Sequence, residues 1–223
     1  MTTTKNRSRG VPRRTAPVET RSRAPLFIGT AVVGVVVLAA IAAFALSGDG
    51  GSGSLAEPRT EAVGISGEAL PALSNPASDP AVGQVIPTIT GTDLEGEPMT
   101  IEPGDGPMAI VLLAHWCDHC RAEVPVLTEY LEANGMPEGV EVVSVSTSIN
   151  AARPNYPPSD WLEEEGWPVR TLVDDTNSRA LASLGMNSFP GFVFVDGTGR
   201  VVQRMTGEIG AEAFDQAVTA LAR

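Results

Sequence analysis

Several residue types are scarce in this sequence, and their scarcity excludes some classes of protein. The chain has only two cysteines, in one C-x-x-C pair, so it lacks the second ligand pair of a zinc site of that kind. Lysine is absent from Ser47 onward, where eight arginines face 26 acidic residues and give a formal charge of 8 − 26 = −18. This acidic composition weighs against nucleic-acid binding and favours an exposed, well-solvated surface.

The first 46 residues have the composition of a cytoplasmic tail followed by a membrane span. Seven basic residues and one acid, Glu19, precede Leu26. The segment Leu26–Leu46 carries no charge, and as a helix it would extend ~31 Å, which matches the ~30 Å hydrocarbon core of a bilayer. Because the basic flank stays in the cytoplasm, we expect residues 1–25 to be a disordered cytoplasmic tail and the chain after Leu46 to be extracytoplasmic.

A cleaved signal peptide is the alternative for the same apolar segment, since Ala43-Phe44-Ala45 resembles an A-x-A cleavage site. The length of the segment favours a retained transmembrane helix over residues 26–46, because the apolar part of a signal peptide has about 7–15 residues. No cysteine lies directly after the segment, so we do not expect a lipoprotein anchor. The predicted location is therefore the cell membrane, with a single pass.

The rest of the chain divides into a predicted linker and a predicted globular domain. Residues 47–82 are rich in Gly, Ser, Pro and Ala, which predicts a flexible extracytoplasmic linker. Residues 83–223 alternate strand and helix patterns, which predicts an α/β domain of three layers around a central mixed sheet.

The expected elements of this domain follow from apolar periodicity and turn residues. The strands are a hairpin of Gln84–Thr90 and Glu97–Ile101, buried strands Met108–Ala114 and Val140–Val145, an extended segment Val169–Val173, and a second hairpin of Phe192–Val195 and Arg200–Met205. The helices are Asp118–Asn134, Trp161–Glu165, Asn177–Leu184 and Ala211–Ala222. The loop Ser148–Pro158 is either a lip over the functional site or a simple connection.

The two cysteines form the motif Cys117-Asp118-His119-Cys120. A purely structural disulfide is a weak interpretation, because closing so short a loop gains only about 2 kcal/mol. The motif lies where a buried strand ends and a helix begins, so Cys117 meets unpaired N–H groups and the positive end of a helix dipole. Both favour the thiolate, which is the form that attacks disulfides. Cys120, one turn into the helix, is expected to be shielded and to resolve a mixed disulfide.

Two segments resemble a known family. Ala114–Pro125 looks like the active-site segment of thioredoxins, in the form found in membrane-tethered, extracytoplasmic proteins of the TlpA/ResA type. Ser188–Gly197 is similar to the segment of that family that carries a cis-proline opposite the cysteines. The resemblance covers roughly Val82–Arg223 and implies a thioredoxin-like three-layer fold, here preceded by one transmembrane helix.

The resemblance also implies roles for individual residues. Cys117 corresponds to the attacking thiol, Cys120 to the resolving thiol, Trp116 to a flanking surface and Pro190 to the cis-proline. Glu123 falls on the acidic position that ResA-type proteins keep near their cysteines.

Three further residues have roles that the sequence leaves more open. Phe189, next to the proline, either shapes partner binding or belongs to the core. The dipeptide between the cysteines contains no proline, unlike the usual pattern of the family. There His119 favours the thiolate of Cys117, whereas Asp118 opposes it because a negative charge disfavours a thiolate.

The leading hypothesis is a thiol–disulfide reductase that acts on extracytoplasmic protein thiols and disulfides. The resemblance implies apocytochromes c among the candidate substrates, a membrane thiol protein as electron donor, and no cofactor or resident metal. One alternative is a disulfide-forming oxidase of DsbA-like direction. Another is a copper-binding or copper-delivery protein, because His115 and His119 lie beside the two thiols and Cu(I) favours thiolates.

Overall fold

The structure of this chain is a computed structural model that describes residues 62–222. The basic tail and the apolar segment 26–46 lie outside the described residues, as does the first part of the linker. Between residues 62 and 222, no helix is long and apolar enough to cross a membrane. The transmembrane helix therefore stays a prediction of the sequence.

A five-stranded mixed sheet forms the centre of the domain, as the sequence predicts. Its strand order is β6-β5-β4-β7-β8. The strands are β4 (Met108–Leu113), β5 (Glu141–Ser146), β6 (Thr171–Val173), β7 (Gly191–Val195) and β8 (Val201–Thr206). The first three strands run parallel to one another, whereas β7 is antiparallel to both β4 and β8.

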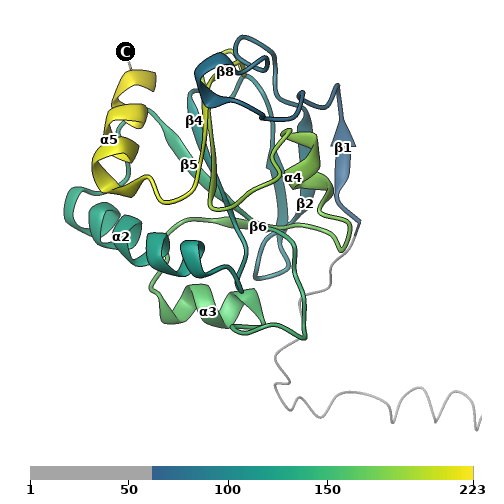
Figure 1. Cartoon of the computed structure of the whole chain (residues 1–223), viewed down its shortest axis with the longest axis vertical. Helices are drawn as coiled ribbons and strands as arrows, with labels where there is room; N and C mark the ends of the chain where they lie inside the picture. Colours follow the sequence, from purple (N-terminus) through teal and green to yellow (C-terminus); the bar gives the residue numbers. More distant parts are fainter. Residues whose placement is uncertain (1–61, 223) are drawn as a thin grey trace, which may run out of the picture. The chain divides into compact units, whose positions relative to one another are not determined.

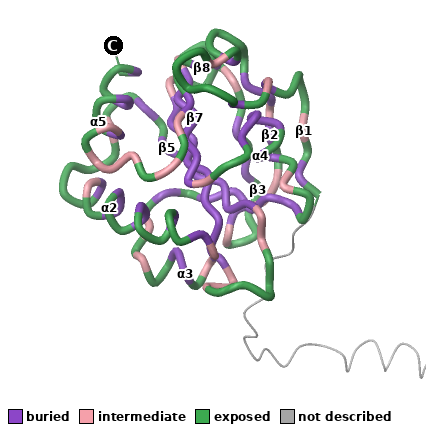
Figure 2. The backbone as a smooth tube through the Cα atoms, viewed as in Figure 1, coloured by how far each residue is buried: buried purple, intermediate pink, exposed green. Residues whose placement is uncertain are grey.

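Both faces of this sheet are covered, which explains why β4 is apolar at every position. Helices α2 (Asp118–Asn134), α3 (Pro158–Glu164) and α5 (Gly210–Leu221) pack on one face, against alternate β4 residues Ala109, Val111 and Leu113. The intervening residues Met108, Ile110 and Leu112 face α4 (Arg179–Ser183) and a second, smaller sheet. Figure 1 shows α2 and α5 on one side of the central sheet and α4 with β1 and β2 on the other. The buried residues run along the central strands (Figure 2). Each fully buried Val, Leu or Ile contributes about 1.5–3 kcal/mol.

The prediction of a flexible linker up to Val82 is wrong for residues 62–82, which belong to the folded domain. Strand β1 (Gly64–Ser66) pairs with β2 (Thr88–Thr92), which pairs with β3 (Pro98–Ile101) in a three-stranded antiparallel sheet. Four apolar side chains of this segment are buried in the core: Val63, Leu70, Leu73 and Ala81. They are spaced irregularly among Gly, Ser and Pro, so the segment has no apolar periodicity from which a folded structure could be predicted.

A buried ion pair fixes the same segment to the central sheet. The side chain of Arg204, on β8, is fully buried and donates to both carboxylate oxygens of Asp79, just after the 3-10 helix η1 (Pro76–Ser78). The remaining guanidinium donors reach the carbonyls of Leu184 at 2.8 Å and Pro71 at 2.9 Å. Removing one partner of such a pair costs about 3–5 kcal/mol, because it leaves a buried charge uncompensated.

Candidate active site

The two cysteines lie at the N-terminus of α2, directly after the buried strand β4. Cys117 is the extended N-cap residue of the helix, and its N–H donates to the carbonyl of Ala114 at 3.0 Å in the turn between strand and helix. Cys120 follows in the first turn, and both residues are free thiols. The strand–motif–helix arrangement predicted from the sequence is confirmed.

Cys117 is less exposed than we expected from its place at the start of a helix. Its residue exposure is 9%, against 0% for Cys120. The Cys117 thiol donates a hydrogen bond to the carbonyl of Phe189, with an Sγ–O distance of 3.4 Å. Trp116 and Phe189 pack against the same hydrophobic cluster as Cys117. Cys117 therefore keeps a small exposed fraction, whereas Cys120 keeps none.

Burial separates the reactivities of the two thiols. It raises the pKa of the Cys120 thiol far above the ordinary value, and repulsion from Cys117 and from the charge of Glu123 raises it further. The N–H of Ala114, 3.4 Å from Cys120 Sγ, offsets only part of this effect. Because the thiolate is the nucleophile, the raised pKa disfavours attack by Cys120 on outside partners.

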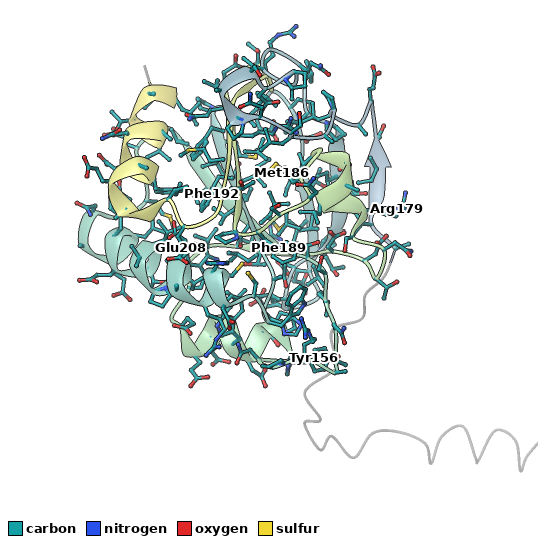
Figure 3. The ribbon with its side chains drawn as sticks, in the orientation of Figure 1. Tyr156, Arg179, Met186, Phe189, Phe192 and Glu208 are labelled. Atoms are coloured by element: carbon teal, nitrogen blue, oxygen red, sulfur yellow. The ribbon has the colours of Figure 1, made fainter. Side chains whose placement is uncertain are left out.

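The segment around Pro190 closes the site from the opposite side. The Phe189–Pro190 peptide bond is cis, as the resemblance implies. Pro190 is buried, and Phe189 is half-buried, with its ring edge-on to Trp116 at a centroid distance of 5.3 Å. Phe189 therefore both accepts from Cys117 through its carbonyl and forms an apolar wall with Trp116, and Figure 3 shows it near the middle of the domain.

Glu123 lies one turn after Cys120 and is almost fully buried, at 2% exposure. Its Oε1 accepts from the N–H groups of Gly210 at 2.9 Å and Ile209 at 3.1 Å. Burial raises the pKa of this carboxyl, the two N–H groups lower it in part, and the nearby charge of Glu208 raises it again. Glu123 thus joins α2 to the first turn of α5 and places an ionisable group close to Cys120.

The two residues between the cysteines point into solvent. The side chain of Asp118 is 92% exposed and lies 3.3 Å from Arg121. That of His119 is 71% exposed, and its Nδ1 lies 2.6 Å from Oε1 of Glu208. The expected contact of this imidazole with Cys117 is replaced by the pair with Glu208. No sequence pattern connects these two positions, which are 89 residues apart.

His115 is fully buried and uses both ring nitrogens within the protein. Nε2 accepts from the N–H of Asn150 at 3.2 Å, so the neutral tautomer carries its proton on Nδ1, which donates to the carbonyl of Pro154 at 2.7 Å. Burial lowers the pKa of this imidazole and keeps it neutral. The histidines are therefore not directed together at the thiols, and no cluster of three His, Cys, Asp or Glu side chains suited to a metal ion occurs in residues 62–222. The copper hypothesis loses its structural motivation.

The loop Ser148–Pro158 is a lip beside Cys117 and not a simple connection. The indole N–H of Trp116 donates to the carbonyl of Ser148 at 2.8 Å. The guanidinium of Arg153 lies over the same indole, 4.6 Å from the ring centroid. The side chain of Asn155 donates to the carbonyl of His115 at 2.8 Å. No sequence pattern marks Arg153 or Glu208. The signals for the lip are the three prolines of the loop and its place after β5.

Comparison with known proteins agrees with this geometry. The sequence profile of the family described as Redoxin matches residues 81–221. The thiol:disulfide interchange protein DsbE homolog of Paracoccus denitrificans is 29% identical over 147 residues, which are 66% of this chain and 74% of the relative. The thiol-disulfide oxidoreductase ResA of Bacillus anthracis is 23% identical over 128 residues, which are 57% of this chain and 70% of the relative.

Among solved structures, the thioredoxin domain of a thiol-disulfide oxidoreductase from Bacteroides vulgatus superposes with a TM-score of 0.52 and 22% identity, over 63% of this chain and 98% of that chain. A thioredoxin-family thiol:disulfide interchange protein from Chlorobium tepidum superposes with a TM-score of 0.53 and 18% identity, over 63% of this chain and 97% of that chain. These likenesses show a thioredoxin-like fold, as the sequence predicts.

Proposed function

This chain belongs to the Redoxin family, and we propose that it is a thiol–disulfide oxidoreductase that reduces disulfides of protein substrates outside the cytoplasm. The observation that carries the proposal is the asymmetry of the cysteine pair. Cys117 caps the N-terminus of α2 and keeps a small exposed fraction, whereas Cys120 is fully buried with a raised pKa. This is the arrangement that thiol–disulfide exchange needs, with one attacking and one resolving thiol.

Reduction of a substrate proceeds in two exchanges. The Cys117 thiolate attacks one sulfur of the substrate disulfide, forms a mixed disulfide and releases the other substrate cysteine as a thiolate. Cys120 then attacks Cys117 Sγ and expels the second substrate thiolate, which takes up the proton of Cys120. The substrate gains two electrons, and the protein is left with a Cys117–Cys120 disulfide. A membrane thiol protein restores the dithiol.

The charges near the pair support reduction over oxidation. A strong oxidant stabilises its reduced, thiolate-bearing form. Here the acid nearest Cys120 is Glu123, and its charge disfavours a thiolate. His119, the residue that would favour the Cys117 thiolate, is paired with Glu208. The resemblance to ResA-type proteins adds apocytochromes c as a substrate class, and we propose them on that ground.

We place this activity at the outer face of the cell membrane. The support is the charge pattern of the N-terminal residues, with a basic flank before an uncharged segment of bilayer length. The domain needs no cofactor for this chemistry, because the electrons reside in the two thiols.

Reduction of insulin disulfides by the full chain, with dithiothreitol as electron source, tests the function. We expect the wild type to accelerate the reduction and the Cys117→Ser and Cys120→Ser variants to give no turnover. A wild-type chain that does not exceed the rate of dithiothreitol alone overturns the proposal.

A further inference from the structure

One arginine at the rim of the site differs from the other arginines of the described domain in having no fixed polar partner. Between residues 62 and 222, the others are bound as follows: Arg121 to Asp118, Arg170 to Asp93, Arg179 to Asp175, Arg204 to Asp79, and Arg200 to the carbonyl of Gly83. Arg153 is exposed, and the contact recorded for its guanidinium is with the face of Trp116. Within residues 62–222, Arg153 therefore has no carboxylate partner, and its guanidinium lies on the side chain of Trp116, the residue before Cys117.

The position of Arg153 is fixed by the loop that carries it. The buried His115 binds this loop on both sides of Arg153, at Asn150 and at Pro154. The indole of Trp116, on which the guanidinium lies, is itself held by the carbonyl of Ser148. A guanidinium stacked on an aromatic ring keeps its N–H donors free at its edge. The cation is thus presented toward solvent in one place.

The charges on the other side of Cys117 already have partners. Asp118 pairs with Arg121, and Glu208 pairs with His119. In Figure 3, Glu208 lies beside α2, and Tyr156, from the loop that carries Arg153, lies on the other side of Phe189. Among the described residues, Arg153 is therefore a positive charge without a carboxylate partner beside Trp116, in a domain that is otherwise strongly acidic.

We propose that Arg153, stacked on Trp116, binds a carboxylate side chain of the substrate polypeptide next to the cysteine that Cys117 attacks. The inference rests on the proposed reductase function and names the substrate class more closely. Acidic residues flanking the target disulfide are favoured, while the apolar wall of Trp116 and Phe189 contacts the rest of the peptide. The guanidinium fork matches a carboxylate in two parallel hydrogen bonds, which a lysine at the same place does not provide.

Peptides that differ in one residue test this inference. Each peptide contains one intramolecular disulfide and one variable residue, which is Glu, Gln or Lys. In one set of peptides the variable residue directly precedes a cysteine of the disulfide, and in a second set it directly follows that cysteine. With the full chain at low ionic strength, we expect kcat/KM to be about fivefold higher for Glu than for Lys in at least one set, the size expected of an exposed ion pair. We expect about 0.5 M salt to remove most of the preference, because it screens exposed charges.

We expect the Arg153→Gln variant to have equal kcat/KM for the Glu and Lys peptides. We expect Arg153→Lys to keep only part of the wild-type preference for the Glu peptide. Arg179→Gln is the matched control, since Arg179 is a half-exposed arginine on α4, and it is expected to keep the wild-type ratio. Equal rates for all peptides with the wild type, or a ratio that survives Arg153→Gln, overturn the recognition by Arg153 and leave the reductase function standing. A wild type that reduces neither these peptides nor insulin overturns both.

Discussion

At the scale of single residues, the chemistry depends on how differently two neighbouring thiols are buried. Cys117 retains a small exposed fraction and a hydrogen bond to the Phe189 carbonyl, whereas Cys120 is enclosed by the core. The raised pKa of Cys120 prevents it from competing for outside disulfides, yet it lies one helical turn from Cys117. In the proposed mechanism, Cys120 reacts with the mixed disulfide that has formed on Cys117.

Trapping of covalent intermediates tests these roles. In Cys120→Ser the first exchange proceeds and the second does not, so we expect mixed disulfides with partners to accumulate. In Cys117→Ser the remaining thiol is buried and protonated, and we expect few or none. Non-reducing gels of affinity-purified variants measure the difference, with the double Ser variant as background. Equal amounts of mixed disulfide in the two single variants would contradict the proposed order, in which Cys117 attacks first and Cys120 second.

The buried carboxyl of Glu123 is expected to lower the free energy of unfolding as the pH rises. Its pKa is raised by burial above its ordinary value of 4.5, so between these two values the folded state binds more protons than the unfolded state. Stability contributed by this group therefore falls as the pH rises through that window, and the loss persists at higher pH. Glutamine does not titrate and still presents one oxygen to Ile209 and Gly210.

We expect the unfolding free energy of Glu123→Gln, relative to wild type, to increase as the pH is raised from about 4 to 8. Urea unfolding at a series of pH values measures it. Glu129→Gln, at an exposed position of the same helix, is the control and should give a curve parallel to wild type. A Glu123→Gln curve parallel to wild type would show that the carboxyl is not destabilised by burial.

The candidate reactive residues could be predicted from the sequence because their spacing is local. Cys117, Cys120 and Glu123 lie within one stretch of a strand–helix unit, and each occupies the place expected from that unit. Glu208 and Arg153 reach the site from distant loops, where nothing in the residue pattern marks them. For the same reason, the sequence predicts an effect of His119 on the Cys117 thiolate but not the pair of His119 with Glu208, which is 89 residues away.

At the scale of elements, the loop Ser148–Pro158 is fixed by one buried side chain. His115→Ala would leave the N–H of Asn150 and the carbonyl of Pro154 without their partner, at a cost of about 1–3 kcal/mol. We expect that loss of unfolding free energy, together with faster amide hydrogen exchange in residues 148–158. His119→Ala is the matched control, because an exposed ion pair contributes only about 0–1 kcal/mol. Equal losses for the two variants would mean that His115 does not hold the loop.

Elements with a regular apolar pattern were predictable, whereas the irregular segment before them was not. Helix α2 begins and ends where the sequence predicts, and β4 differs by one residue at its end. Residues 62–82 form only one short strand and a single turn of 3-10 helix, and they are held by scattered apolar contacts and by the Arg204–Asp79 pair. Neither the three-residue strand nor a salt bridge between residues 125 positions apart produces a periodic signal.

At the scale of the whole molecule, the proposed function places the domain outside the cytoplasm. We expect a reporter fused after Arg223 to be active only when it is extracytoplasmic, and the protein to remain with membranes after alkaline washing. Both results follow from the basic flank and the uncharged segment 26–46. Release of a soluble fragment that begins near Leu46 would show that the segment is a cleaved signal peptide.

The central claim is the direction of electron flow, and the reduction potential of the Cys117–Cys120 couple tests it most directly. Equilibration of the full chain with glutathione buffers, followed by alkylation of free thiols, measures this potential. We expect a value between those of thioredoxin and DsbA, about −270 and −120 mV, and nearer to thioredoxin, because Glu123 opposes the thiolate and Glu208 engages His119. A value close to that of DsbA would contradict the reductase and establish an oxidase.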